Sequence, residues 1–171
     1  MARLIIIGAG GFGQTVRDLA VQTGEYGSVC FLDDNSADAN VIGKCDDFAR
    51  FIGDGTEYVV ALGNNALRMQ WLGKLADAKA GMATIIHPTA YVSPTAKMAE
   101  GCMVLPQAVV NTNCVLGRGC IVNIGALIDH GCILGECVHV APGGIVKAEN
   151  RLPPMMKVES GEVIQNRQYP L

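Results

Sequence analysis

An aliphatic residue returns at every sixth position through the second half of the chain. The series is Ile86, Val92, Met98, Val104, Val110, Leu116, Val122, Ile128, Leu134, Val140, Val146 and Leu152. A helix repeats about every 3.6 residues and a strand every two, so neither alone selects this period. Hexapeptide repeats are typical of a parallel β-helix, in which each repeat forms one flat side and its aliphatic residue points inward. The pattern therefore predicts coils of three hexads, each stacked on the one before.

The cysteines follow the same period. If each hexad is counted from its aliphatic residue, Cys102, Cys114, Cys120 and Cys132 all occupy the fifth place, which alanine fills in other hexads. A free cysteine behaves as a small hydrophobic residue. We therefore interpret them as reduced corner residues of the coil, whereas Cys137 lies outside the fifth place and does not fit this reading.

Charge limits the classes of partner. Lysine and arginine total 13 against 16 acidic residues, and no basic tract is available to neutralise a phosphate backbone, so nucleic acid is not an expected partner. The apolar run at residues 4–7 is too short for a signal peptide, and no stretch is long enough to span a bilayer. We expect a soluble, cytoplasmic protein.

The N-terminal residues have the pattern of a strand, a glycine turn and a helix. An aliphatic run at residues 4–7 leads directly into Gly8, Gly10 and Gly13, which satisfy GxGxxG. Glycines let the backbone approach a phosphate, and the helix N-terminus offers unpaired N–H groups. The strand before the motif and the helix after it strengthen an otherwise weak signal for nucleotide binding.

Two aspartates follow the second predicted strand, residues 28–32. Asp33 and Asp34 lie about 20 residues beyond the glycine turn, a spacing typical of a carboxylate that binds a ribose hydroxyl. The same residues are also suited to an ordinary turn, because Asp and Asn side chains bond their own backbone. Both interpretations stay open at this point.

The N-terminal unit is small. A third strand at residues 58–62 is followed by Gly63 and by a helix with Leu67, Trp71 and Leu75 on one face. The resulting βαβ-type fragment is roughly half of a full dinucleotide fold. A mononucleotide or nucleotide-sugar therefore fits better than NAD, which disfavours an oxidoreductase.

The predicted domains are a small Rossmann-like nucleotide-sugar-binding unit at 1–84, a β-helix at 85–152 and a tail at 153–171. Pro153 and Pro154 are expected to end the coil, and the tail to close in a hairpin over residues 158–163. Apolar residues also occupy the outward-facing sixth place. They are Val109, Val115, Ile121, Leu127, Ile133 and Ile145. An exposed apolar surface of this regularity indicates a homo-oligomer.

Two of the three histidines lie close together in the coil. His130, at the third place of its hexad, can project outward from a rigid strand and accept a proton near neutral pH, although an ordinary solvated histidine explains its position equally well. His139 is at a sixth place and could contact a ligand or a second copy, and His87 is expected to be structural. No spacing on a strand-built coil gathers four ligands, so we expect no metal site.

Taken together, these segments resemble the sugar O-/N-acyltransferases of the sialic acid O-acetyltransferase and PglD type. The segments that carry the resemblance are the glycine turn, residues 31–34, residues 61–65 with Arg68, the hexads, and His130 followed by residues 139–143. The resemblance covers about residues 3–150. It implies a left-handed β-helix, a homotrimer, and transfer of an acetyl group from acetyl-CoA to the amine or hydroxyl of a sugar, commonly a UDP-amino-sugar.

The resemblance also assigns roles to individual residues. His130 matches the family's general base, and His139 with Gly143 matches its acyl-CoA side. The residues that match its nucleotide-sugar side are Gly10, Gly11, Phe12, Gly13, Asp33, Asp34 and Gly63. The two ligands are expected to meet near His130.

A noncatalytic alternative stays open beside the acyltransferase. Gly131 follows His130 where the family usually carries an acidic residue, and the repeats are expected to stop near Leu152, earlier than in the family. Both features fit a trimeric nucleotide-sugar-binding or scaffolding protein with a degenerate donor site.

Overall fold

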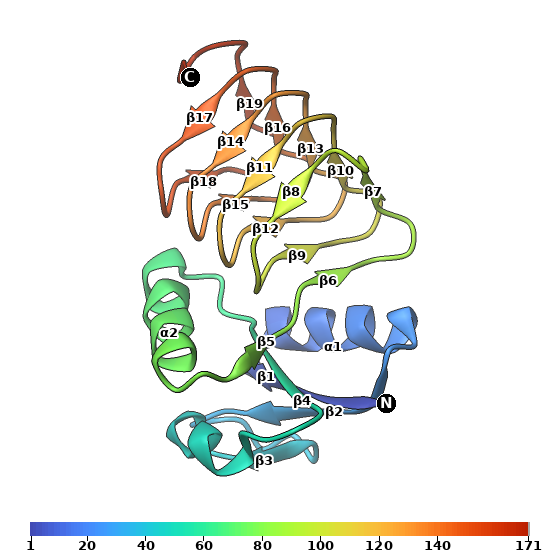
Figure 1. Ribbon diagram of the computed structural model, residues 1–171, viewed down its shortest axis with the longest axis vertical. Helices are drawn as coiled ribbons and strands as arrows, with labels where there is room; N and C mark the ends of the chain where they lie inside the picture. The colour runs from blue at the N-terminus through green and yellow to red at the C-terminus, as the bar shows by residue number, and fades with distance from the viewer. Residues whose placement is uncertain (171) are drawn as a thin grey trace.

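The computed structural model describes residues 1–170 and contains an N-terminal α/β unit followed by a coil of short strands (Figure 1). The coil lies above the N-terminal unit in Figure 1, with α1 directly beneath its first strands. Within the described residues, no helix has the length and apolar character needed to cross a membrane.

Five parallel strands form the sheet of the N-terminal unit, in the order β3-β2-β1-β4-β5. In chain order the elements are β1 (Ala2–Ile7), α1 (Gly11–Thr23), β2 (Tyr26–Leu32), β3 (Val41–Gly43), a 3₁₀ helix (Cys45–Phe51), β4 (Thr56–Val60), α2 (Asn65–Asp77) and β5 (Gly81–Met82). The three predicted strands and two predicted helices are all present. The sequence pattern missed the short edge strands β3 and β5, whose two or three residues give no periodic signal.

Local chemistry explains where the helices begin and end. β1 is buried on both faces, which accounts for its unbroken aliphatic run. Helix α1 ends at Gly24 in the left-handed conformation, and the side chain of Asn64 caps α2 by accepting the Leu67 N–H at 2.9 Å.

The hexads form a left-handed parallel β-helix, as predicted. Its strands are β6 (Ile85–Ile86), β7 (Tyr91–Val92), β8 (Lys97–Met98), β9 (Met103–Val104), β10 (Val109–Val110), β11 (Val115–Leu116), β12 (Ile121–Val122), β13 (Leu127–Ile128), β14 (Ile133–Leu134), β15 (His139–Val140), β16 (Ile145–Val146), β17 (Arg151–Leu152), β18 (Lys157–Val158) and β19 (Val163–Ile164). They stack into three sheets, which we call the β6 face (β18-β15-β12-β9-β6), the β7 face (β19-β16-β13-β10-β7) and the β8 face (β17-β14-β11-β8).

The interior of the coil is filled as the hexad pattern predicts. The first-place residues from Val104 onward are buried, and so are the fifth-place cysteines and alanines between them. The thiols of Cys102 and Cys120 also donate to backbone carbonyls of the following coil, at 3.2 and 3.1 Å. The cysteines are therefore packed as small corner residues.

The fourth place of each hexad has its own backbone requirement. Every fourth-place residue from Gly101 to Arg167 has a positive φ, because the chain turns the corner there. Cys137, which lies outside the fifth place, occupies such a fourth place with φ 56°, and Gly131 occupies another with φ 68°. Glycine adopts this conformation at little cost, so the corner itself explains a glycine after His130.

The prediction that the coil ends at Leu152 is wrong. β18 and β19 pair in parallel with β15 and β16, so the described residues 154–170 add strands to the coil and form no hairpin. Pro154 occupies a third place at a corner, as Pro142 does, and a proline is tolerated there. Buried Asn150 holds the corner formed by residues 165–169. Its side-chain Nδ2 donates to Gln165 O at 2.9 Å, and its Oδ1 accepts the Tyr169 N–H at 2.7 Å.

The N-terminal unit covers the β6 face. Residues of α1 and β1 share a hydrophobic cluster with the outward-facing residues Met103 and Ile121 of the coil. The prediction that Ile121 is exposed is therefore wrong, because the N-terminal unit covers the outward-facing residues of the β6 face and leaves only those of the β7 and β8 faces uncovered. On those two faces Val115 and Leu127 are exposed, whereas Val109, Ile133 and Ile145 are half-buried.

Candidate functional site

The glycines of the N-terminal turn divide into two kinds. A Cβ at Gly13 would lie 2.1 Å from Gly8 O, and a Cβ at Gly8 would lie 2.8 Å from the Leu62 side chain, so both are required for packing. A Cβ at Gly10 or at Gly11 would have no atom within 4 Å. These two glycines open the N-terminus of α1 to the outside, where an anionic group would meet free backbone N–H groups.

Asp33 is largely engaged within the protein. One carboxylate oxygen accepts the Ala9 N–H at 2.8 Å, and the other accepts the N–H groups of Asn35 and Ser36 at 2.8 and 2.7 Å. These bonds lower the pKa of Asp33, against the opposing effect of burial. Asp33 thus forms the turn and also ties it to the glycine loop, while exposed Asp34 accepts the Cys45 N–H through one oxygen only.

A buried arginine joins the N-terminal unit to the coil. The Arg68 side chain is 0% exposed, and its guanidinium donates to Leu62 O at 2.7 Å, Gly119 O at 2.9 Å and Cys137 O at 2.8 Å. Asn65 Oδ1 accepts a further bond at 2.8 Å. None of these acceptors is a carboxylate, so the junction keeps an uncompensated positive charge, and burial lowers the pKa of Arg68.

His139 lies at the same junction. Its ring is 8% exposed and its centroid is 6.4 Å from that of Phe12, a residue of the glycine turn. Asn123 Nδ2 approaches His139 Nε2 at 3.2 Å, Nδ1 is buried, and the backbone of Gly63 lies against the ring. Burial, followed by the charges of Arg68 and Lys157, lowers the pKa of His139 to about 4. The histidine is therefore neutral at pH 7.

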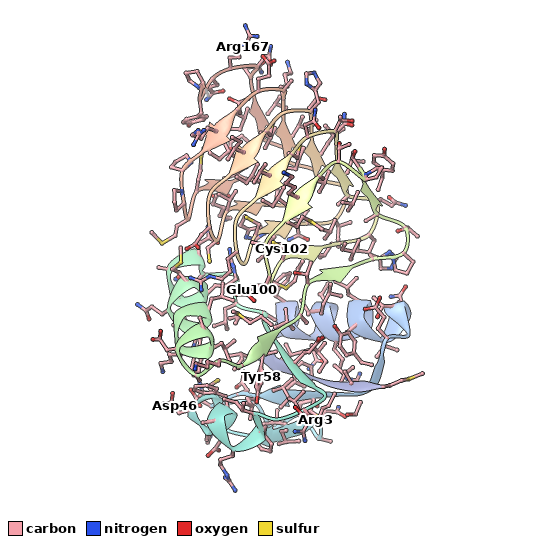
Figure 2. The ribbon with its side chains drawn as sticks, viewed as in Figure 1. Arg3, Asp46, Tyr58, Glu100, Cys102 and Arg167 are labelled. Carbon is pink, nitrogen blue, oxygen red and sulfur yellow. The ribbon has the colours of Figure 1, made fainter. Side chains whose placement is uncertain are left out.

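His130 lies elsewhere. It is exposed at the corner between the β7 and β8 faces, which we call the free corner (residues 129–132 and their stacked equivalents). In the triangular coil this corner is opposite the β6 face, and Figure 2 shows Arg167, which lies on the same corner, at the end of the molecule farthest from the N-terminal unit. Asp129 Oδ1 accepts the backbone N–H of His130 at 2.7 Å, so this oxygen fixes the backbone of the histidine and not its ring.

The predicted site residues thus fall into two groups. The junction gathers Gly10, Gly11, Phe12, Gly13, Gly63 and His139, and Gly143 lies on the exposed corner that follows β15. Within one chain His130 is not near them, and His139, predicted on the acyl-CoA side, packs against the N-terminal unit. The sequence did not predict the roles of Asn123 and buried Arg68 at the junction. In the sequence, Asn123 is marked only as a polar residue next to a buried strand, and Arg68 only as a polar residue on a buried helix face.

The chain is similar to known acetyltransferases and to a domain found in them. The model of the PglD N-terminal domain matches residues 3–75. A UDP-N-acetylbacillosamine N-acetyltransferase of Bacillus subtilis (strain 168) is 30% identical over 113 residues, which cover 61% of this chain and 51% of the relative. The chain therefore spans about half the length of this curated relative.

Solved structures extend the likeness to both parts of the chain. The acetyltransferase domain of PglB from Neisseria gonorrhoeae FA1090, in complex with acetyl coenzyme A, matches with a TM-score of 0.92 and 35% identity over 96% of this chain and 82% of that chain. A mutant perosamine N-acetyltransferase from Caulobacter crescentus, in complex with CoA and GDP-perosamine, shares the fold with a TM-score of 0.74 and 24% identity over 98% and 92% of the two chains. The resemblance drawn from the sequence is confirmed, and the chain belongs to the PglD-type family of hexapeptide-repeat sugar acetyltransferases.

Proposed function

We propose that this protein transfers the acetyl group of acetyl-CoA to the amine or hydroxyl of a nucleotide-linked sugar. The observation that carries the proposal is the combination, in one chain, of an open glycine turn and a β-helix, matched over 96% of its length to an acetyltransferase domain with acetyl coenzyme A bound. Relatives named for UDP- and GDP-linked amino sugars support a nucleotide-sugar acceptor. A UDP-amino-sugar is the acceptor we favour.

The residues of the chain suit acceptor binding at the junction. Open Gly10 and Gly11 leave the N-terminus of α1 accessible to a diphosphate, and the partial positive charge of the helix end favours an anion. Exposed Asp34 keeps one carboxylate oxygen available to a ribose hydroxyl. Neither group requires a metal ion.

His130 is the general base of this proposal. Its exposed imidazole accepts the proton that the acceptor amine loses as its nitrogen attacks the thioester carbonyl. As the C–S bond breaks, the imidazolium returns this proton to the sulfur, so that coenzyme A leaves as the thiol. Most of the rate advantage then comes from holding amine and thioester together, with proton removal as a second contribution.

The separation of His130 from the junction within one chain supports a site shared between copies. On the β7 face the outward-facing residues are all apolar, namely Tyr91, Val109, Leu127, Ile145 and Val163. Tyr91, Leu127 and Val163 are exposed, and such a stripe is suited to a second copy of the chain. We propose a homotrimer in which the free corner of one copy meets the junction of the next, with acetyl-CoA held along the coil near Gly143.

The noncatalytic alternative has lost one of its two supports, since the coil continues beyond Leu152. The direct test incubates the protein with acetyl-CoA and a panel of UDP- and GDP-linked amino sugars and follows thiol release. Turnover with one acceptor supports the enzyme. Absence of turnover with every acceptor, together with measurable nucleotide-sugar binding, would favour the binding protein.

Complementation tests whether the site is shared. Co-expression of His130→Ala and His139→Ala chains yields mixed trimers, and a site that takes His130 from one copy and the junction from another regains about one quarter of wild-type activity. If each site lies within one chain, the mixture stays as inactive as the separate variants.

A further inference from the structure

The peptide groups around His130 are tied to the coils before and after it. The Gly131 N–H donates to Thr112 O at 2.9 Å, and the Glu149 N–H donates to His130 O at 3.1 Å. The backbone N–H of His130 itself has no carbonyl partner, and a side chain accepts it instead, namely Asp129 Oδ1 at 2.7 Å. One carboxylate oxygen thus supplies the contact that the backbone ladder leaves open.

The N–H at the third place needs the same solution at other corners of the coil. Asn111 Oδ1 accepts the Thr112 N–H at 2.8 Å, and Asn123 Oδ1 accepts the Ile124 N–H at 2.8 Å. Elsewhere a proline, which has no N–H, occupies the third place, as at Pro88, Pro94, Pro106, Pro142 and Pro154. An Asp or Asn side chain at the second place therefore serves the backbone of the residue that follows it.

Two side chains of the preceding coil hold Asp129. Because Asn111 Oδ1 is turned to the Thr112 N–H, the Asn111 Nδ2 group is the end that donates to Asp129 Oδ1, at 3.1 Å. The buried thiol of Cys114 donates to the backbone carbonyl of Asp129 at 3.0 Å. The carboxylate and the peptide group on the N-terminal side of His130 are thus both fixed from below.

Neither bond of the carboxylate reaches the imidazole. Among residues 1–170 the structure gives the ring of His130 no hydrogen bond, so the position of the ring follows from its backbone. A general base has to come within hydrogen-bond distance of the proton that it takes. A displacement of about 1 Å can lower the rate roughly 10²-fold, so the anchoring of this backbone bears directly on catalysis.

We propose that Asp129 is a positioning residue for His130, that it acts through the backbone N–H and not through the imidazole, and that Asn111 sets the direction of its carboxylate. The negative charge is not required, because an amide oxygen accepts an N–H in the same way, as Asn111 and Asn123 do. The effect on catalysis rests on the proposed function. The hydrogen bonds rest on the geometry of the corner alone.

Two substitutions separate the hydrogen bond from the charge. Asp129→Asn keeps an acceptor for the His130 N–H and should keep kcat close to that of the wild type. Asp129→Ala removes the acceptor and should lower kcat roughly 10- to 100-fold, with little change in KM for acetyl-CoA or for the sugar. Ser93→Ala is the matched control. Ser93 lies in the same column two coils earlier and accepts the Thr95 N–H at 3.3 Å, so its loss should leave kcat unchanged.

Exchanging the two partners provides a rescue. Asn111→Asp alone places two carboxylates against each other, turns Asp129 away from the His130 N–H and should lower kcat, because like charges directly opposite repel. The double variant Asn111→Asp with Asp129→Asn restores one donor and one acceptor between the side chains. It leaves an oxygen for the His130 N–H, so its kcat should return toward the wild-type value.

Amide hydrogen exchange reads the bond without any turnover. The chain has three histidines, so histidine-specific ¹⁵N labelling gives three backbone amide signals, and His130→Ala identifies the one that belongs to His130. We expect this amide to exchange roughly 5- to 10-fold faster in Asp129→Ala than in the wild type. Asp129→Asn and Ser93→Ala should retain the wild-type exchange rate.

Three results would overturn the inference. They are an Asp129→Asn variant as slow in acetyl transfer as Asp129→Ala, an Asp129→Ala variant with wild-type kcat, and a His130 amide whose exchange does not respond to Asp129→Ala. A wild type without turnover contradicts the proposed function instead, and the exchange rates then decide by themselves whether Asp129 holds the backbone of His130.

Discussion

His130 and His139 are nine positions apart in the sequence, yet they occupy opposite parts of the coil. His130 is exposed at the free corner, and none of the described hydrogen bonds involves its ring. His139 is buried at the junction, where Asn123, Phe12 and Arg68 surround it. The repeat positions both residues with equal regularity, but their chemistry differs because the N-terminal unit covers one face of the coil and not the corner opposite.

This contrast separates two uses of one scaffold. A side chain at the free corner costs the fold little and is available for chemistry, whereas a side chain at the junction is held by two structural units and its protonation is set by them. Changes at the free corner should therefore alter activity, and changes at the junction should alter both stability and ligand binding.

The largest expected effect is on activity at the free corner. His130→Ala should lower kcat by roughly 10²- to 10⁴-fold, because the acceptor loses its general base. The free energy of unfolding should change by less than about 0.5 kcal/mol, because the side chain is exposed. Acetyl-transfer assays and urea titration on the same preparation check both statements. Full activity in the variant would remove His130 from the mechanism.

At the junction the largest effect is on stability. Arg68→Met removes a buried guanidinium and leaves the carbonyls of Leu62, Gly119 and Cys137 without their donor. We expect a loss of about 3–5 kcal/mol in the free energy of unfolding, measured by urea titration. The exposed Arg50→Met variant is the matched control and should lose less than about 1 kcal/mol.

The same contrast explains how much the sequence could predict. The hexad period identified the inward-facing residues, because a buried aliphatic ladder appears directly as a repeat. It could not identify Ile121 as covered, because nothing within the repeat records where the N-terminal unit docks. The sequence did not predict the end of the coil, for a related reason. Proline usually ends a strand, whereas here Val158 and Ile164 continue the period beyond Pro153.

Site residues divide in the same way. The glycine turn was identifiable because its chemistry depends on consecutive residues. The junction was not, because Arg68, Asn123 and His139 come from separate elements that meet only in the folded chain. Asp33 shows that a local motif does not decide between two roles. Its carboxylate suits a ribose contact, but here it accepts three backbone N–H groups of the turn and the glycine loop.

A pH titration isolates the junction. The folded pKa of His139 is about 4 against an ordinary value of 6.5, so the unfolded chain binds more protons between these values. Stability should therefore fall by about 3 kcal/mol as the pH drops from about 6.5 to about 4. His139→Gln should flatten this part of the profile. The lowered pKa values of Asp33, Asp38 and Asp47 act from about pH 5 downward, so the part of the profile above that pH reports on His139.

The smallest effect compares two glycines that share a backbone conformation. Gly119 and Gly131 both occupy fourth places, with φ 67° and 68°. A Cβ at Gly131 would lie 3.6 Å from the Glu149 side chain, an ordinary contact, so Gly131→Ala should cost only the left-handed backbone, about 1 kcal/mol. A Cβ at Gly119 would lie 2.2 Å from Leu72 of α2, so Gly119→Ala should cost about 1–3 kcal/mol more.

The difference between these two variants measures how tightly the N-terminal unit is packed on the coil. The substitution Leu72→Ala removes the side chain that the new Cβ would meet, so it should lessen the added cost of Gly119→Ala and leave that of Gly131→Ala unchanged. A double-mutant cycle by urea titration gives the coupling directly. Equal costs for the two glycines, with no coupling to Leu72, would mean that α2 moves freely away from the corner and that the junction is not rigid enough to fix the state of His139.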